Sequence, residues 1–355
     1  MRLCFHEPNP EIDDMIQALM DKADVNLNRD IIREIIIAGL KTDQDTKDRC
    51  TLKMMNMTLK EMRYTAKVFD PYGDRLKISV FGSARTGQDT SLYNMARSFA
   101  GKMIDRGFMV ITGGGPGIME AANKGAGPDN SFGVTIKLPF EQLTNEIIAN
   151  NPRTIHYKYF FNRKIAFIKE THAVALFPGG FGTLDEATEA ITLVQTGKQN
   201  PMPIVLLETK NYGYWEKWLD FVERQLLAEG YISAEDVSLL SIYNDETLAA
   251  DAIASFYRNY HSMRCVGNLV VIRLKNLPGE YEMARLNEEF SDCLAPGGLF
   301  ELRGALPEEQ DEPILCNMPR LTFPFNKQSY ARLRALIDCI NSFKTGCMHL
   351  KRIAV

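Results

Sequence analysis

Apolar residues recur at helical spacing through the first part of the chain. Ile12, Met15, Ile16 and Leu19 fall on one helical face, and similar spacing holds over residues 31–40 and 52–59. This period predicts helices between residues 11 and 66. Methionines at helical spacing usually fill cores, so we expect a packing layer or a dimer contact here rather than a cofactor site.

After residue 76 the pattern changes to short, uninterrupted apolar runs, which predict strands. Helical patterns separate these runs, and continuous apolar strands are typical of a parallel sheet that is covered on both faces. The sequence therefore predicts an α/β fold, a Rossmann-like doubly wound parallel sheet. The expected strands are residues 77–81, 108–112, 131–136, 173–177 and 203–207.

The end of the chain predicts a small α+β module. Strands are expected at residues 269–274, 299–303 and 321–325, and helices at 281–294 and 329–343, without any motif that indicates chemistry. A turn at residues 70–74 and a boundary near His261 divide the chain. We expect a helical N-terminal segment (1–74), a Rossmann-like domain (75–260) and the α+β module (261–355).

Composition and charge exclude several classes of function. The 355 residues include 45% hydrophobic and 24% charged residues, with a formal net charge of −4, so no basic excess favours nucleic acid or a membrane surface. Neither a membrane-length apolar run nor a signal peptide is visible, and we expect a cytoplasmic protein. The seven cysteines form no C-x-x-C pair and the five histidines are dispersed, which predicts reduced thiols and no metal.

The most informative stretch is a glycine-rich turn between a predicted strand and a predicted helix. A helix N-terminus offers unpaired N–H groups and partial positive charge, and glycines let the backbone approach an anion closely. Thr183 could cap the helix or offer its hydroxyl to a phosphate. The stretch reads Pro178-Gly179-Gly180-Phe181-Gly182-Thr183-Leu184-Asp185-Glu186.

Glu186 is the unusual residue of this stretch. If the helix begins at Thr183, then Leu184, Ala187 and Ile191 share its apolar face, and Glu186 points away from that face toward the space above the glycine loop. Acids are common in first helical turns, so Glu186 is either an ordinary first-turn acid or a group that acts on a molecule bound through its phosphate.

A second glycine-rich turn follows the strand predicted at residues 108–112. It lacks the spacing of the dinucleotide fingerprint and the Lys-Ser/Thr pair of a P-loop. One such turn could be purely structural, but two at strand carboxyl ends favour a shared ligand crevice. The residues are Gly113-Gly114-Gly115-Pro116-Gly117-Ile118-Met119-Glu120.

Two adjacent cations, Arg163 and Lys164, begin a predicted helix and so oppose its dipole. An anionic ligand would explain them, and solvation at the surface is the alternative.

Together these motifs resemble the LONELY GUY (LOG) phosphoribohydrolases, a family whose members are often mislabelled lysine decarboxylases. The resemblance rests on the stretches 113–121, 162–164 and 178–186, which occur in the family's order, and it covers roughly residues 76–257. The helical N-terminal segment and the C-terminal module lie outside the short plant-type enzymes.

The resemblance implies cleavage of the N-glycosidic bond of a nucleoside 5′-monophosphate, such as AMP or a cytokinin ribotide, without a cofactor or metal. It implies a catalytic Glu186 and Arg163, and a homodimer that needs neither nucleic acid nor a membrane. The residues implied to bind substrate are Gly179, Gly180, Gly182, Thr183, Gly114, Gly115, Gly117, Glu120, Lys164, Ser83 and Arg85.

Three alternatives compete with this interpretation. A nucleotide sensor of the same fold would bind without hydrolysis, and the extra C-terminal module could bind a regulatory nucleotide. A molybdenum-cofactor carrier shares the fold, but the presence of both Arg163 and Glu186 argues against it. A decarboxylase would need a pyridoxal-phosphate lysine in a dedicated fold, which nothing in the sequence supports.

Overall fold

The computed structural model describes residues 10–137 and 144–343. The chain divides into two compact units, one ending at Tyr64 and the other beginning at Thr65. No helix among the described residues is both long and apolar enough to cross a membrane.

The first unit is helical, as the sequence predicts. It contains α1 (Pro10–Lys22), α2 (Arg29–Asp45) and the first part of α3 (Arg49–Phe69). Its core is small and centres on Ile16, Met20 and Ile37. Many other apolar side chains of these helices are exposed and lie outside this core. They include Met15, Leu19, Ile31 and Met55.

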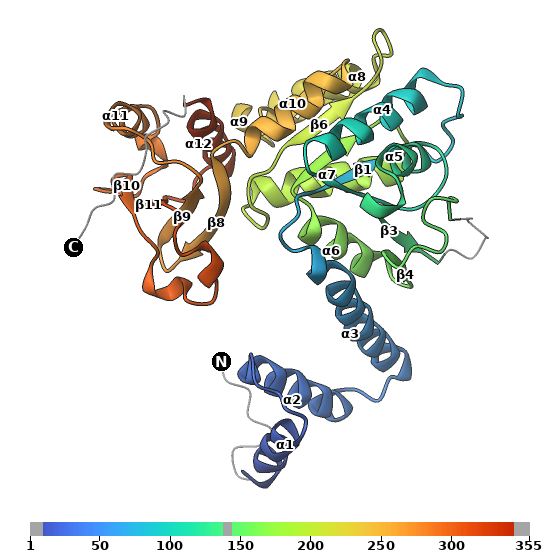
Figure 1. Cartoon of the computed structure of the whole chain (residues 1–355), viewed down its shortest axis with the longest axis vertical. Coiled ribbons are helices and arrows are strands. Elements are labelled where there is room, and N and C mark those ends of the chain that lie inside the picture. The colour runs from blue at the N-terminus through green and yellow to red at the C-terminus, as the bar shows by residue number, and fades with distance from the viewer. Residues whose placement is uncertain (1–9, 138–143, 344–355) are drawn as a thin grey trace. The chain divides into compact units, whose positions relative to one another are not determined.

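The second unit contains a seven-stranded parallel sheet with flanking helices, which confirms the predicted α/β fold class (Figure 1). The strand order is β4-β3-β2-β1-β5-β6-β7. The strands are β1 (Lys77–Phe81), β2 (Met109–Thr112), β3 (Ser131–Ile136), β4 (Thr154–Tyr157), β5 (Ala173–Leu176), β6 (Ile204–Leu207) and β7 (Leu240–Tyr243). The helices are α4 (Ser91–Asp105), α5 (Ile118–Ala126), α6 (Phe160–Glu170), α7 (Phe181–Gln195), α8 (Tyr214–Phe221), α9 (Ala234–Val237) and α10 (Glu246–Phe256).

The two edge strands, β4 and β7, are absent from the sequence-based prediction. β4 contains Thr154 and the exposed His156, and β7 is only partly buried, so neither forms the continuous apolar run expected of a central strand. Both strands are recognisable only through their pairing with β3 and β6.

The order of the strands indicates where a ligand would bind. From β1 the chain proceeds through β2 and β3 to β4 on one side, and then returns to β5 on the other side of β1. The carboxyl ends of β1 and β5 therefore flank the topological switch point, where open α/β sheets bind their ligands. Residues 82–85 follow β1 at this point, and the stretch 178–186 follows β5.

The C-terminal module is a four-stranded antiparallel sheet with two helices. The sheet order is β10-β11-β9-β8, from β8 (Tyr260–Val266), β9 (Leu269–Leu274), β10 (Glu301–Arg303) and β11 (Arg320–Pro324). The helices are α11 (Glu280–Glu289) and α12 (Tyr330–Ser342). β8 is also absent from the sequence-based prediction, and it passes through His261, where a boundary is expected.

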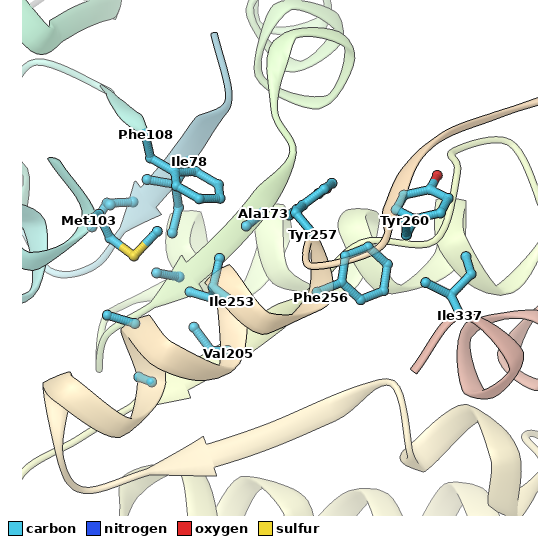
Figure 2. Packing of buried hydrophobic residues seen from close by; sticks show 14 of the residues in the cluster. Ile78, Met103, Phe108, Ala173, Val205, Ile253, Phe256, Tyr257, Tyr260 and Ile337 are labelled. Carbon is cyan, nitrogen blue, oxygen red and sulfur yellow. The ribbon is translucent and has the colours of Figure 1, made fainter. Parts of the chain in front are cut away.

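One continuous core joins this module to the parallel sheet. Figure 2 shows Phe256, Tyr257 and Tyr260 between the sheet residue Ala173 and Ile337 of α12. The aromatic rings of Phe256 and Tyr260 pack edge to face, with their centroids 5.3 Å apart.

Candidate active site

The glycine-rich turn after β5 forms the floor of the crevice. α7 begins at Phe181 with Gly180 as its N-cap residue, so Thr183 does not cap the helix, which was one of the two roles expected for it. Thr183 is instead buried in the first turn, with its hydroxyl beside Gly179. A Cβ atom on Gly179 would overlap this hydroxyl and lie 3.0 Å from the backbone nitrogen of Ser83. Ser83, Gly179 and Thr183 are therefore brought together as a backbone cradle.

Gly180 and Gly182 face open space, since a Cβ atom added to either residue would meet no atom from elsewhere in the fold within 4 Å. A phosphate could therefore approach the first turn of α7 here without displacing protein atoms. The partial positive charge of the helix N-terminus favours such an anion.

Three hydrogen bonds hold the cradle in place, and two of them involve Tyr214. The backbone N–H of Ser83 donates to the carbonyl of Pro178 (3.1 Å), and the Tyr214 hydroxyl donates to the carbonyl of Gly179 (2.6 Å). Glu208 in turn accepts from the backbone N–H of Tyr214 (2.7 Å). Tyr214 is not among the residues that the sequence predicts, although its place after the carboxyl end of β6 could have drawn attention to it.

A pocket of about 670 Å³ opens beside the cradle. Arg85 is exposed at its wall, and the Ser83 hydroxyl accepts from the backbone N–H of Arg85 (3.1 Å). Tyr212 and Tyr214 line the same pocket, so it combines cationic, hydroxyl and aromatic groups.

The second glycine-rich turn packs against the loop that follows β1. Gly114 and Gly117 have positive φ angles of 75° and 68°, which favour glycine. A Cβ on Gly117 would overlap the carbonyl of Ser83, and the N–H of Ile118 donates to that carbonyl (3.1 Å). Both glycine turns thus contact Ser83 in the loop that follows β1.

Asn145, which the sequence does not predict either, fixes the second turn. Its buried side-chain amide donates to the carbonyls of Gly114 (3.2 Å) and Gly115 (3.1 Å) and to the Asn123 side chain (3.0 Å). No periodicity or motif marks an isolated Asn of this kind, because its role depends on a contact across the fold.

Arg163 lies in the first turn of α6, beside the second glycine-rich turn. Its Nε donates to the carbonyl of Val134 (2.9 Å), its guanidinium group lies over the ring of Phe167, and it fills the space beside Gly113. Burial lowers the pKa of Arg163, while the charge of Glu186 opposes that shift. Within the described residues Arg163 forms no ion pair closer than 4 Å with a carboxylate, although the charge of Glu186 acts on it over a longer distance.

Glu186 is buried, with 6% of its surface exposed, and its Oε2 atom has no hydrogen-bond partner among the described residues. Burial raises the pKa of Glu186 to about 7, against the opposing charges of Lys164 and Arg163. Buried polar atoms without partners are rare in folded proteins and are concentrated where function needs them. Glu186 thus lies on the buried face of α7 with Thr183, Ala187 and Ala190, and the expected orientation away from the packed face is wrong. Packing of α7 against its neighbours, which the sequence does not reveal, decides which side of the helix is buried.

Lys164 links α6 to α7 through three carboxylates. Its ammonium nitrogen lies 2.7 Å from Glu189, 3.0 Å from Asp185 and 3.7 Å from Oε2 of Glu186. The positive charge of Lys164 therefore lies beside Glu186, although its shorter contacts are with Glu189 and Asp185.

Glu120 already has protein partners. It lies in the first turn of α5, paired with Lys124 (2.6 Å), and accepts from the Gln88 amide (3.0 Å), so a ligand contact would have to compete with both. Among residues 10–137 and 144–343, no group of three or more His, Cys, Asp or Glu side chains is arranged to hold a metal ion.

Comparison with known proteins places the chain in a family. Residues 109–253 match the family described as "Possible lysine decarboxylase". The chain is 31% identical over 156 residues, 43% of its length, to the probable cytokinin riboside 5′-monophosphate phosphoribohydrolase LOGL3 of Oryza sativa subsp. japonica, and covers 72% of that protein. It is 30% identical over 159 residues to the probable cytokinin riboside 5′-monophosphate phosphoribohydrolase LOG6 of Arabidopsis thaliana, covering 44% of the chain and 76% of that protein.

Among solved structures, the chain matches the molybdenum cofactor carrier protein MCP from Chlamydomonas reinhardtii. It is 21% identical, with a TM-score of 0.36, over 50% of the chain and 96% of that protein. The sequence relatives carry the assignment, because LOGL3 exceeds 30% identity over most of its own length. The chain therefore belongs to the LOG family of phosphoribohydrolases.

Proposed function

We propose that the protein hydrolyses the N-glycosidic bond of a purine nucleoside 5′-monophosphate, of the AMP or cytokinin-ribotide type, to free base and ribose 5-phosphate. The observation that carries this proposal is Glu186, a buried carboxyl group with an oxygen that lacks a hydrogen-bond partner among the described residues. It lies in the helix whose N-terminus forms the glycine cradle. The names of LOGL3 and LOG6, which describe phosphoribohydrolases of cytokinin riboside 5′-monophosphates, support the reaction class.

The cradle binds the 5′-phosphate in this mechanism. Gly179, Gly180, Gly182 and Thr183 supply backbone N–H groups, a hydroxyl and the positive end of α7. The phosphate does not react, so its binding energy serves to position the ribose at the carboxyl group of Glu186.

Glu186 and Arg163 act on the sugar. Departure of the base leaves positive charge on the ribose, which an ionised Glu186 stabilises. The same carboxylate accepts a proton from the water that attacks the anomeric carbon, and a pKa of about 7 suits a general base at neutral pH. Arg163 orients the nucleotide from α6, where it lies beside Gly113.

The protein is further proposed to form a homodimer through the exposed apolar side chains of α6. Phe160, Phe161 and Ile165 are each more than 40% exposed, and Phe181, at the start of the neighbouring α7, is 92% exposed. Clusters of exposed aromatic residues mark contact surfaces in soluble proteins.

The decisive experiment is a substrate panel. Purified protein is incubated with AMP, GMP, IMP, CMP and isopentenyladenosine monophosphate, and free base is quantified by chromatography. We expect release from at least one purine monophosphate, and little from adenosine, which lacks the phosphate. If no base is released from any nucleotide while AMP still binds, the chain is a nucleotide-binding protein and the hydrolase proposal is wrong.

A further inference from the structure

A second cavity, of about 970 Å³, lies at the edge of the parallel sheet opposite the glycine turns. Its walls include Arg75, before β1, and His172, before β5. The C-terminal module contributes His261 from β8 and Lys275 immediately after β9. The amino ends of parallel strands share one edge, so this cavity is separate from the crevice at their carboxyl ends. Its size is typical of a small-molecule site.

Carboxylates neutralise part of the positive charge that lines this cavity. Arg264 pairs with Asp311 (2.9 Å) and Glu312 (2.8 Å). Arg273 pairs with Glu309 (2.6 Å) and again with Glu312 (2.5 Å). The acids of residues 309–312 are therefore already engaged by these two arginines.

Other cations of the lining remain without an acidic partner. Within the part of the chain that the structure describes, neither Arg75 nor Lys275 forms an ion pair, and the ammonium group of Lys275 donates to the carbonyl of Tyr257 (2.6 Å). Burial lowers the pKa of His261, and the nearby charges of Lys275 and Arg273 lower it further. Asp74 also lies at the wall, next to Arg75, and balances only part of this charge.

An apolar surface adjoins these cations. Tyr257 and Tyr260 line the cavity and are 7% and 3% exposed, and Met202 and Met263 lie in the same wall. Figure 2 shows both tyrosines at the junction between the parallel sheet and α12. The cavity therefore combines a cationic side with an apolar side, which fits an anionic group attached to an organic body.

We propose that this cavity binds a phosphate monoester of a small organic molecule, at a site distinct from the active-site crevice. A phosphate monoester carries a charge of about −1.5 to −2 at pH 7, which matches two cations without acidic partners. In this arrangement the phosphate contacts Lys275, Arg75 and His261, and the organic part lies over Tyr257 and Met202. The C-terminal module thus takes part in ligand binding, because it supplies Lys275 and His261.

Hydrogen exchange of the full-length protein, measured by mass spectrometry, tests the site without relying on turnover. Exchange is followed with inorganic phosphate, ribose 5-phosphate, AMP or citrate. Peptides covering residues 73–76 and 311–316 report on this cavity, and peptides covering residues 179–186 report separately on the glycine cradle. We expect ribose 5-phosphate or AMP to slow exchange in the cavity peptides at least twofold.

Variants give the second arm of the test. Lys275→Gln is expected to raise the midpoint concentration for protection of the cavity peptides at least tenfold. Protection of the cradle peptides should be unchanged. Lys217→Gln, an exposed lysine on α8 outside the cavity, is the matched control and keeps the wild-type midpoint.

The proposal is overturned if no phosphate compound slows exchange at residues 73–76 and 311–316, or if Lys275→Gln keeps the wild-type midpoint. Equal protection by citrate would refute phosphate as the recognised group. If inorganic phosphate protects the cavity peptides as strongly as ribose 5-phosphate and AMP do, the cavity does not recognise an organic group attached to the phosphate. Each result is read from the cavity peptides, so failure of hydrolysis at the cradle leaves this test intact.

Discussion

Burial determines the acid–base behaviour of Glu186. Its carboxyl group is 6% exposed and is opposed by two nearby cations, Lys164 and Arg163, which do not restore an ordinary carboxylate pKa. A group with a pKa of about 7 changes its charge within the physiological range, whereas an exposed glutamate is ionised throughout it.

The first prediction concerns pH. Glu186 must be ionised to accept a proton, so kcat/KM for AMP should rise with pH up to about 7 and level off above it, with a slope of one proton. Initial rates of adenine release between about pH 5 and 9 give this profile. A rate that stays constant across this range would show that ionisation of Glu186 does not control the reaction.

The second prediction concerns stability at the same residue. The pKa of Glu186 is raised in the folded state, so the wild-type protein should lose stability as pH rises from about 4.5 to about 7. Glu186→Gln cannot ionise at this position and lacks this loss. Its free energy of unfolding relative to wild type should therefore increase by on the order of 3 kcal/mol between acidic pH and about pH 8. Urea unfolding at acidic and alkaline pH, on either side of this window, measures the difference. An equal difference between the two proteins at both pH values would contradict the raised pKa.

The third prediction concerns the support of the glycine cradle. Tyr214→Phe removes the hydroxyl that donates to the carbonyl of Gly179, a neutral hydrogen bond with a net contribution of about 1 kcal/mol. We expect KM for AMP to rise about fivefold with little change in kcat, because the phosphate site is loosened while Glu186 is untouched. Tyr231→Phe, at a side chain that is 75% exposed, is the control. An unchanged KM would remove Tyr214 from the site.

At the residue scale, the sequence predicted which side chains are candidates for the site, but not their pKa values or their contacts. The glycines, Arg163 and Glu186 stood out because their types and spacings are unusual. The pKa of Glu186 and the contacts of Asn145 and Tyr214 depend on packing between segments that are far apart in the sequence, so no local pattern could reveal them.

At the scale of elements, a buried ion network braces the C-terminal module. Glu309 accepts from Arg320 (3.1 Å) and Arg273 (2.9 Å), and all three side chains are at most 3% exposed. Burial alone would raise the pKa of Glu309, but the backbone N–H of Leu306 and the two arginines hold it down to about 2.

The fourth prediction follows from this network. Glu309→Gln leaves the buried Arg320 without its counter-charge and Arg273 with Glu312 alone, and should lower the free energy of unfolding by about 3 kcal/mol. Glu301→Gln, which breaks the half-exposed pair with Arg303, should cost less than about 1 kcal/mol. Denaturant titration at neutral pH compares the two variants. Equal, small effects would show that the buried network does not stabilise the module.

Element prediction from the sequence succeeded for central strands and failed at edges. β1 and β3 were predicted with their observed bounds because they are continuous apolar runs that are buried nearly throughout. β4, β7 and β8 are mixed and partly exposed, so their identity depends on their partners in the sheet.

At the scale of the whole molecule, the exposed apolar side chains of α6 bear on assembly. α6 also carries Arg163 and Lys164, so the proposed dimer contact and the active site share one helix. The fifth prediction is that the double substitution Phe161→Glu and Ile165→Glu converts a dimer to a monomer in light-scattering measurements. Leu277→Glu, at a similarly exposed site on the C-terminal module, should leave the dimer intact. A wild-type monomer would contradict the proposed contact.

The proposed ribotide hydrolysis depends above all on the carboxylate of Glu186 in the glycine-lined crevice. The most direct test measures AMP binding by calorimetry and adenine release by chromatography on the same preparations of wild-type protein and Glu186→Gln. We predict that the variant binds AMP within about threefold of wild type and releases adenine at least ~10² more slowly, the range expected for a positioned acid–base group. Wild-type turnover in Glu186→Gln, with AMP binding intact, would contradict the account.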